Sequence, residues 1–320
     1  MSVLRFATSA FLIGLMVLGA SVVSGQSFPT KPIRIVGPVA GGSGDIASRL
    51  IAAEISGPLG QQVIVDNRPS NLGPEIVAKS PADGYTLLET GSAAWLGPLM
   101  QDNVPWDALR DFTGITLLER SPNVLVVHPS LPVTSVKELI AMAKAKPGEL
   151  NFSSSTAGGS SHLAGELFKS MAGVNIVWVP YKGSAPAALA LIAGEVQLAF
   201  SSAGAATPHI KSGKMKALAT TGLRPSQQLP DLPLIANSGL PGFEVASIDV
   251  MLAPAKTPAA VITRLNREIV QVMNRPDVRA RLLGIGTEVA VSSPEETTAL
   301  IRSETAKWGK LIKEAGLRAD

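Results

Sequence analysis

Short apolar runs alternate with segments of helical periodicity through most of this 320-residue chain, and this alternation limits the folds open to it. Strands separated by helices of roughly 10 to 15 residues are typical of α/β proteins with mainly parallel sheets. The apolar runs that we interpret as strands are 33–37, 62–66, 86–90, 114–120, 123–129, 150–155, 176–181, 196–202, 215–221 and 247–254. Aromatic residues make up only 4% of the chain, so we expect a core rich in Ala, Val, Leu and Ile.

From about residue 255 onward the chain reads as helices with no strands between them. Those helices must cover a sheet made earlier, so we expect the chain to leave a first domain, build a second and return. The best crossing strands are 123–129 and 247–254, each of which ends at a proline. Two such crossings form a hinge with a cleft between the domains. The predicted domains are 26–125 together with 250–320, and 126–249.

The first 25 residues have the pattern of a secretory signal. Arg5 is the only charge ahead of an apolar stretch that ends at Val23. Small residues follow, with Val23 and Gly25 suitably placed for cleavage before Gln26. We therefore expect residues 1–25 to direct export. The alternative is an uncleaved N-terminal anchor, because the apolar segment is nearly long enough to span a bilayer.

Composition excludes several classes of function. The formal net charge is only +3, and no basic run or basic–aromatic alternation indicates a nucleic-acid surface. With no cysteine, the chain has neither disulfides nor thiolate metal ligands. The histidines lack partners three or four residues away, and they are His128, His162 and His209. We therefore expect neither a metal nor a cofactor.

Enzyme motifs are also missing. The sequence contains no G-x-S-x-G and no phosphate-binding loop. The acidic residues Glu166, Glu195 and Asp249 are scattered, and nothing in the sequence pairs them as acid and base. We therefore expect a protein that is not an enzyme.

One alternative keeps an enzymatic function open. Gly42, Gly44 and Ala47 match the G-x-G-x-x-A fingerprint of dinucleotide-binding folds, and Asp66 ends the next apolar run where a ribose-binding carboxylate belongs. This pattern is that of an NAD-dependent enzyme. Export to a compartment without a nicotinamide pool argues against it, and a lone motif is weak support.

Turns rich in Gly, Ser and Thr follow several of the predicted strands. They are 40–45, 90–94, 153–162, 181–185 and 201–207. Such turns lie at the carboxyl ends of strands in an open α/β sheet, where ligands bind. Backbone N–H groups at helix starts, together with hydroxyls, attract carboxylates without a full positive charge. The alternative for any single turn is ordinary loop chemistry.

A series of sequence blocks, in this order, resembles the Bug family of periplasmic substrate-binding proteins of tripartite tricarboxylate transporters. The blocks include "GGSGDIASRL", "ADGYTLL", "NVLVVHPS", "VPYKGSAPA", "PHIKSGKMKALA" and "LAPAKTP". The resemblance covers residues 28–320. It implies a type II periplasmic-binding-protein fold, with two α/β domains, a two-strand hinge and a small carboxylated organic acid in the cleft. It also implies a monomeric periplasmic protein that works with membrane permease subunits.

The resemblance assigns ligand contacts from both domains. From the first domain, the residues expected to contact one carboxylate are Gly41, Gly42, Ser43 and Asp45, with Thr90, Gly91 and Ser92 on the same wall. From the second domain, the residues expected at the distal carboxylate, the cleft edge and the floor are Ser160, Ser161 and His162, then Tyr181, then Ser201 and Ser202. Lys182 is interpreted as a solvated lysine at the rim.

The sequence departs from the family pattern at three places. The first loop, "GPVAGGSGD", is about one residue short and lacks an aromatic residue, and the segment after "NRP" is also shortened. Phe200-Ser201 stands where the family commonly has Phe-Asp. An aspartate there would favour a ligand amine, so the serine speaks against an amino-acid ligand. Delivery to a permease and signalling to a sensor partner both remain open.

Overall fold

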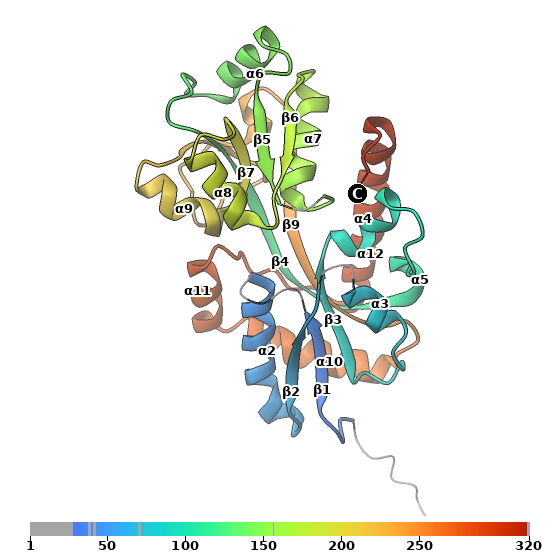
Figure 1. Cartoon of the computed structure of the whole chain (residues 1–320). Coiled ribbons are helices and arrows are strands. Elements are labelled where there is room, and N and C mark those ends of the chain that lie inside the picture. The colour runs from blue at the N-terminus through green and yellow to red at the C-terminus, as the bar shows by residue number, and fades with distance from the viewer. Residues whose placement is uncertain (1–27, 38–39, 41–42, 70–71, 156, 319–320) are drawn as a thin grey trace, which may run out of the picture. The chain divides into compact units, whose positions relative to one another are not determined.

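Two long antiparallel strands, β4 (Phe112–Val127) and β9 (Ala246–Pro254), run through the centre of the sheet (Figure 1). The computed structural model describes residues 28–320 apart from 38–39, 41–42, 70–71, 156 and 319–320. The ladder between the two strands extends from Phe112 opposite Pro254 to Pro122 opposite Ala246. Beyond Pro122, β4 pairs with other strands, so it belongs to both halves of the sheet.

Strands β1, β2 and β3 lie on the β9 side of this pair, and with their helices they form what we call the first lobe. β1 pairs in parallel with β2 and β3, whereas β3 pairs antiparallel with β9. The bounds are β1 Ile33–Gly37, β2 Val63–Asn67, β3 Thr86–Gly91, α2 Ser43–Leu59, α3 Gly73–Ala78, α4 Ala93–Met100, α5 Ala108–Asp111, α10 Ala259–Met273, α11 Pro276–Gly284 and α12 Pro294–Ala315. The C-terminal helices pack on α2 and α4, which is the return that the sequence predicts.

The other half of the sheet, with its helices, forms the second lobe. β5 pairs in parallel with β6 and β7, while β7 and β8 each pair antiparallel with β4. The bounds are β5 Asn151–Ser154, β6 Val177–Pro180, β7 Leu198–Ser202, β8 Lys216–Thr220, α6 Val136–Ala145, α7 Ser160–Ala172, α8 Ser184–Ile192, α9 Ala203–Lys211 and a 3₁₀ turn, η1, Ile235–Ser238. The sheet order is β2-β1-β3-β9-β4-β7-β5-β6, with β8 also on β4.

The structure confirms the α/β class and the apolar runs as strands, with two differences. The segments 114–120 and 123–129, which we expect to be separate strands, form the single strand β4. The sheet is also less parallel than expected, because four of its named strand pairs are parallel and four are antiparallel. A strand that crosses from one lobe to the other must be met by one that returns, and that pairing is antiparallel.

Helix starts follow local sequence signals in most cases. Ser293 and Glu296 form a complete capping box at α12. At α6, Ser135 accepts from the Glu138 N–H at 3.2 Å, but the Glu138 carboxylate reaches the N–H of Thr134 instead of that of Ser135. Most of the expected signals therefore place their helices within a residue of the observed starts.

The core of the second lobe depends on close contact between α7 and β5. Phe152 is fully buried, and its ring meets that of Phe200 edge-on at 6.2 Å. A Cβ added at Gly165 on α7 would come 2.0 Å from the Phe152 ring. Gly165 is therefore required for α7 to lie this near to the sheet.

Within the described residues, no helix combines the length and the apolar character needed to cross a membrane. The predicted secretory signal at residues 1–25 lies outside the described residues. The domain bounds predicted from the sequence stay a prediction, although the crossing of β4 and β9 between the lobes agrees with a two-strand hinge.

We predict that Gly165→Ala destabilises the protein by about 1–3 kcal/mol, because overpacking against Phe152 outweighs the helix propensity gained by alanine. The matched control is Gly309→Ala in α12, where the new Cβ would have an ordinary 3.5 Å contact with Leu99. That variant should be neutral or up to about 1 kcal/mol more stable. Urea denaturation measures both, and equal effects of the two substitutions would contradict the packing argument.

Candidate functional site

The predicted ligand turns of the two lobes meet at one hydrogen bond. The Ser92 hydroxyl, at the start of α4 in the first lobe, donates to the Gly158 carbonyl before α7 in the second lobe at 3.1 Å. A Cβ at Gly158 would also lie 3.2 Å from the Met100 sulfur at the end of α4. The β3–α4 turn and the β5–α7 loop are therefore in direct contact.

In the first lobe, Asp45 is held by the protein itself. Its buried carboxylate accepts from the Asn67 side-chain amide at 2.8 Å and pairs with Arg49 at 2.9 Å. These contacts fix the start of α2 next to the end of β2. Ser43 is exposed at that helix start, while Gly41 and Gly42 lie outside the described residues.

The remaining residues of the first wall stand at the end of β3. Thr90 is buried and its hydroxyl makes a long, 3.4 Å hydrogen bond to the Gly91 carbonyl. Gly91 lies opposite Asp249 on β9, and a Cβ there would come 2.9 Å from an Asp249 carboxylate oxygen. Glycine at this position therefore makes room for the Asp249 carboxyl.

In the second lobe, the start of α7 is organised by its own side chains. Ser161 Oγ accepts from the Ser155 N–H at 3.0 Å and lies 2.8 Å from the Ser155 hydroxyl. His162 Nδ1 accepts from the Gly158 N–H at 3.1 Å, and Ser160 is the first helical residue. The structure thus brings Ser160, Ser161 and His162 together beside the loop that Ser92 contacts.

His162 is a neutral hydrogen-bonding group. Burial, with a smaller contribution from Lys169, lowers the pKa of His162 to about 4. Its ring stacks on Trp178 with centroids 3.9 Å apart, and Trp178 donates to the Ser154 hydroxyl at 2.8 Å. Because Nδ1 accepts, the neutral ring carries its hydrogen on Nε2, which is left to donate.

The other second-lobe residues serve more local contacts. Tyr181 donates its hydroxyl to Glu195 at 3.0 Å, while its neighbour Lys182 is exposed. Ser202 caps α9 by accepting from the Ala205 N–H at 3.4 Å. Ser201 is buried, and its hydroxyl has no hydrogen-bond partner.

Asp66, the residue on which the dinucleotide alternative depends, is engaged in ion pairs. It ends β2 near Arg34 at 3.5 Å and Arg68 at 3.0 Å. These two guanidinium groups occupy the carboxylate that a ribose would need. The glycine part of that motif includes Gly42, which lies outside the described residues.

Sequence reasoning missed a cluster of three carboxyls at the strand crossing. Asp249, which we expect to be isolated, lies opposite Glu119 in the β4–β9 ladder and shares a hydrogen bond with it. Glu89 on β3 is the third member, and burial raises the pKa of all three carboxyls, with mutual repulsion adding to the shift for Glu89 and Glu119. The signal that could have found them is the register between strands far apart in the sequence.

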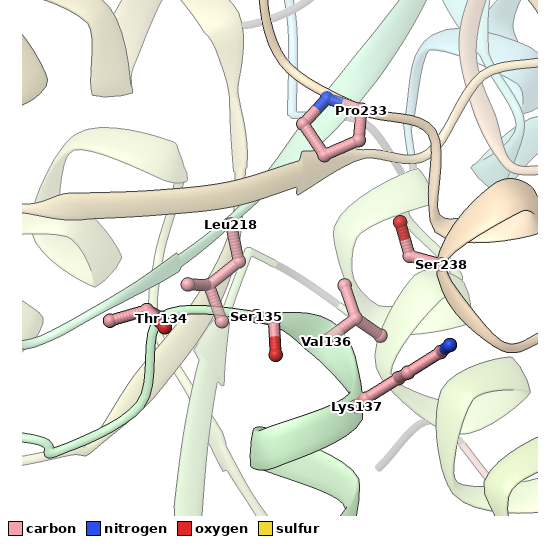
Figure 2. Close-up of a pocket in the computed structure, with 7 residues that line it drawn as sticks. All are labelled: Thr134, Ser135, Val136, Lys137, Leu218, Pro233 and Ser238. Atoms are coloured by element: carbon pink, nitrogen blue, oxygen red, sulfur yellow. The ribbon is translucent and has the colours of Figure 1, made fainter.

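A separate hollow of about 220 Å³ opens in the second lobe at the start of α6 (Figure 2). Its lining is Thr134, Ser135, Val136, Lys137, Leu218, Pro233 and Ser238, none of which belongs to the turns above. In the part of the chain that the structure describes, no group of three or more His, Asp or Glu is placed to hold a metal ion.

Comparisons with known proteins extend the resemblance found in the sequence. The family model described as "Tripartite tricarboxylate transporter family receptor" matches residues 47–317. BugT of Bordetella pertussis is 34% identical over 96% of this chain and 97% of its own length. An R. palustris protein solved with adipate is 38% identical, with a TM-score of 0.82 over 91% of this chain and 99% of that chain. The solved periplasmic binding protein BugD is 31% identical, with a TM-score of 0.79 over 91% and 99% of the two chains.

We predict that neutral His162 makes the protein less stable as the pH falls from 7.5 to 5. The unfolded chain takes up a proton on this residue near pH 6.5, but the folded protein does so only near 4, so acid favours unfolding through this interval. At pH 5 the effect is about 2 kcal/mol. Urea denaturation at both pH values should show that the unfolding free energy of His162→Gln falls less than that of the unmodified protein. Equal losses would contradict the assignment.

Proposed function

We propose, since this chain belongs to the tripartite tricarboxylate transporter family of receptors, that it captures a small carboxylated organic acid in the periplasm and delivers it unchanged to a transporter. Its family and its solved neighbours are solute-binding receptors and not enzymes. The relative solved with adipate supports a carboxylate ligand. The periplasmic relative BugD and the predicted signal support the compartment, and the family description supports membrane permease subunits as partners of a monomeric receptor.

The observation that carries this proposal is a set of helix starts left open where the lobes meet. Helices α4, α7 and α8 begin at Ser92, Gly159 and Gly183 without a side-chain cap. Helices α6 and α12, by contrast, are capped by their own serines, as is α9 beside the site. The first N–H groups of a helix have no partner within it, and they bind carboxylates well. Hydroxyls and the His162 N–H add uncharged donors, which suits reversible capture.

Closure about β4 and β9 is the motion that we propose. The domains would be the predicted segments, 26–125 with 250–320 and 126–249, rotating about the crossing strands. Ligand contacts made from both lobes exist only in the closed form, so the ligand shifts the equilibrium toward it. The Ser92–Gly158 hydrogen bond is then one of the contacts that closure forms.

We predict that Ser160→Pro weakens carboxylate binding about tenfold or more without lowering the stability of the empty protein. Proline is favoured at the first position of a helix, where it removes one N–H, and the extended backbone of Gly159 (φ −71°, ψ 157°) accepts a following proline. A hydrogen bond to a charged group is worth about 1.5–3 kcal/mol. Calorimetric titration with adipate measures the change.

Two control variants and a neutral ligand define the outcome. Ser160→Ala loses the same hydroxyl but keeps the N–H, and Ala259→Pro makes the same exchange at the exposed start of α10. Both should bind more tightly than Ser160→Pro. A thermal-shift panel of di- and tricarboxylates, nicotinate and 1,6-hexanediol should show stabilisation by acids alone. Stabilisation by the diol alone would overturn the carboxylate proposal.

We predict that saturating ligand compacts the protein in small-angle scattering. Ser92→Ala should need several-fold more ligand for the same compaction, because it loses one hydrogen bond worth about 1 kcal/mol between the lobes. Hexanediol at the same concentration is the control. An unchanged radius of gyration at saturation would rule out hinge closure.

A further inference from the structure

The three carboxyls at the strand crossing lie on one face of the sheet. Glu119 and Asp249 are directly opposite in the β4–β9 ladder. Asp249 is also opposite Gly91 on β3, two residues from Glu89, which has the same orientation as Gly91. The cluster therefore stands at the carboxyl end of β3, where the Gly91–Ser92 turn of the proposed site begins.

Glu89 is the member that the protein leaves unsatisfied. Its side chain is 2% exposed, and neither carboxylate oxygen has a hydrogen-bond partner. Glu119 and Asp249 share a hydrogen bond, so one proton satisfies that pair. A buried carboxyl without a donor is costly and is rare outside functional sites.

The Glu89 carboxyl also occupies the start of α2. A Cβ placed on Gly44, in the first turn of that helix, would come 2.6 Å from a Glu89 oxygen. Asp45, in the same turn, adds a second carboxyl to this region. Two acidic side chains already face the helix start at which the sequence predicts a ligand carboxylate, so a further anion there meets repulsion.

Asp249 connects the cluster to the site. Glu89 and Glu119 are buried, whereas Asp249 keeps part of its surface accessible although burial raises its pKa. Within the described residues, no cationic side chain contributes to the environment of any of the three. No metal-binding arrangement is present among those residues either. The group that suits this end of the site is a hydrogen-bond donor with a positive charge.

We infer that the ligand carries a protonated amine as well as a carboxylate, with the ammonium beside Asp249 and Glu89 and the carboxylate at the open helix starts of the second lobe. This inference rests on the proposed carboxylate-binding function. An ammonium has three donors and can satisfy several carboxyl oxygens at once. The first lobe then supplies the acidic group that Ser201 does not supply in the second.

The test compares diacids with their 2-amino derivatives by calorimetric titration at pH 7. The pairs are glutarate with glutamate, and adipate with 2-aminoadipate. We expect the amino member of at least one pair to bind at least tenfold more tightly, which corresponds to about 1.4 kcal/mol. Glu89→Gln should reduce that ratio to below about threefold while leaving the affinity for the plain diacid equal or higher.

Glu89→Gln should fold at least as well as the unmodified protein, because it removes a buried carboxyl that has no partner. Asp249→Asn should also reduce the preference for the amine. The control is Glu268→Gln, which changes a buried carboxylate paired with Arg264 and Arg267 on α10 and should keep the preference.

The outcomes separate the two proposals. Diacids that bind without any preference for the amine would overturn this inference and leave the proposed function intact. A preference that persists in Glu89→Gln would overturn the role of the cluster. Failure of every acid and amino acid to bind would overturn the proposed function, and this inference with it.

Discussion

The antiparallel ladder between β4 and β9 is the constraint on which the rest of the structure depends. The two strands pair from Phe112–Pro254 to Pro122–Ala246, and β4 then continues into the second lobe to pair with β7 and β8. Strand β3 is held by β9, so the first lobe is tied to the same pair. Each lobe thereby presents the carboxyl ends of its parallel strands beside this ladder. The contact between Ser92 and Gly158 follows from that arrangement.

The apolar runs in the sequence predict the strands well, because burial of Val, Ile and Leu determines both. They do not predict that 114–120 and 123–129 are one strand, since Ser121-Pro122 reads as a break between them. A proline donates no hydrogen bond, but Pro122 stands at the end of the ladder with β9, where the strand changes partners. The local signal was interpreted as a chain break when it marks a change of pairing.

The candidate site divides in the same way. The turns rich in Gly and Ser are visible in the sequence because their composition is local, and so are the serine caps of α6, α9 and α12. The carboxyl cluster is not, because Glu89, Glu119 and Asp249 are brought together only by strand register. Their roles depend on neighbours that no local pattern records. Asp45 illustrates the point, since its sequence position suggests a ligand contact and its structure shows bonds to Asn67 and Arg49.

An asymmetry of charge between the two walls follows from these placements. The second-lobe wall offers neutral donors, including the N–H groups that open α7 and the Nε2–H of His162, whose low pKa keeps it uncharged. The first-lobe wall carries buried carboxyls beside the start of α2. Burying Glu89 without a donor makes the empty protein less stable than its fold requires, and such departures from local consistency are concentrated at functional sites. A ligand that supplied the missing donor would recover that free energy only when bound between the walls. The same residue that lowers the stability of the empty form would then strengthen the selection of the ligand.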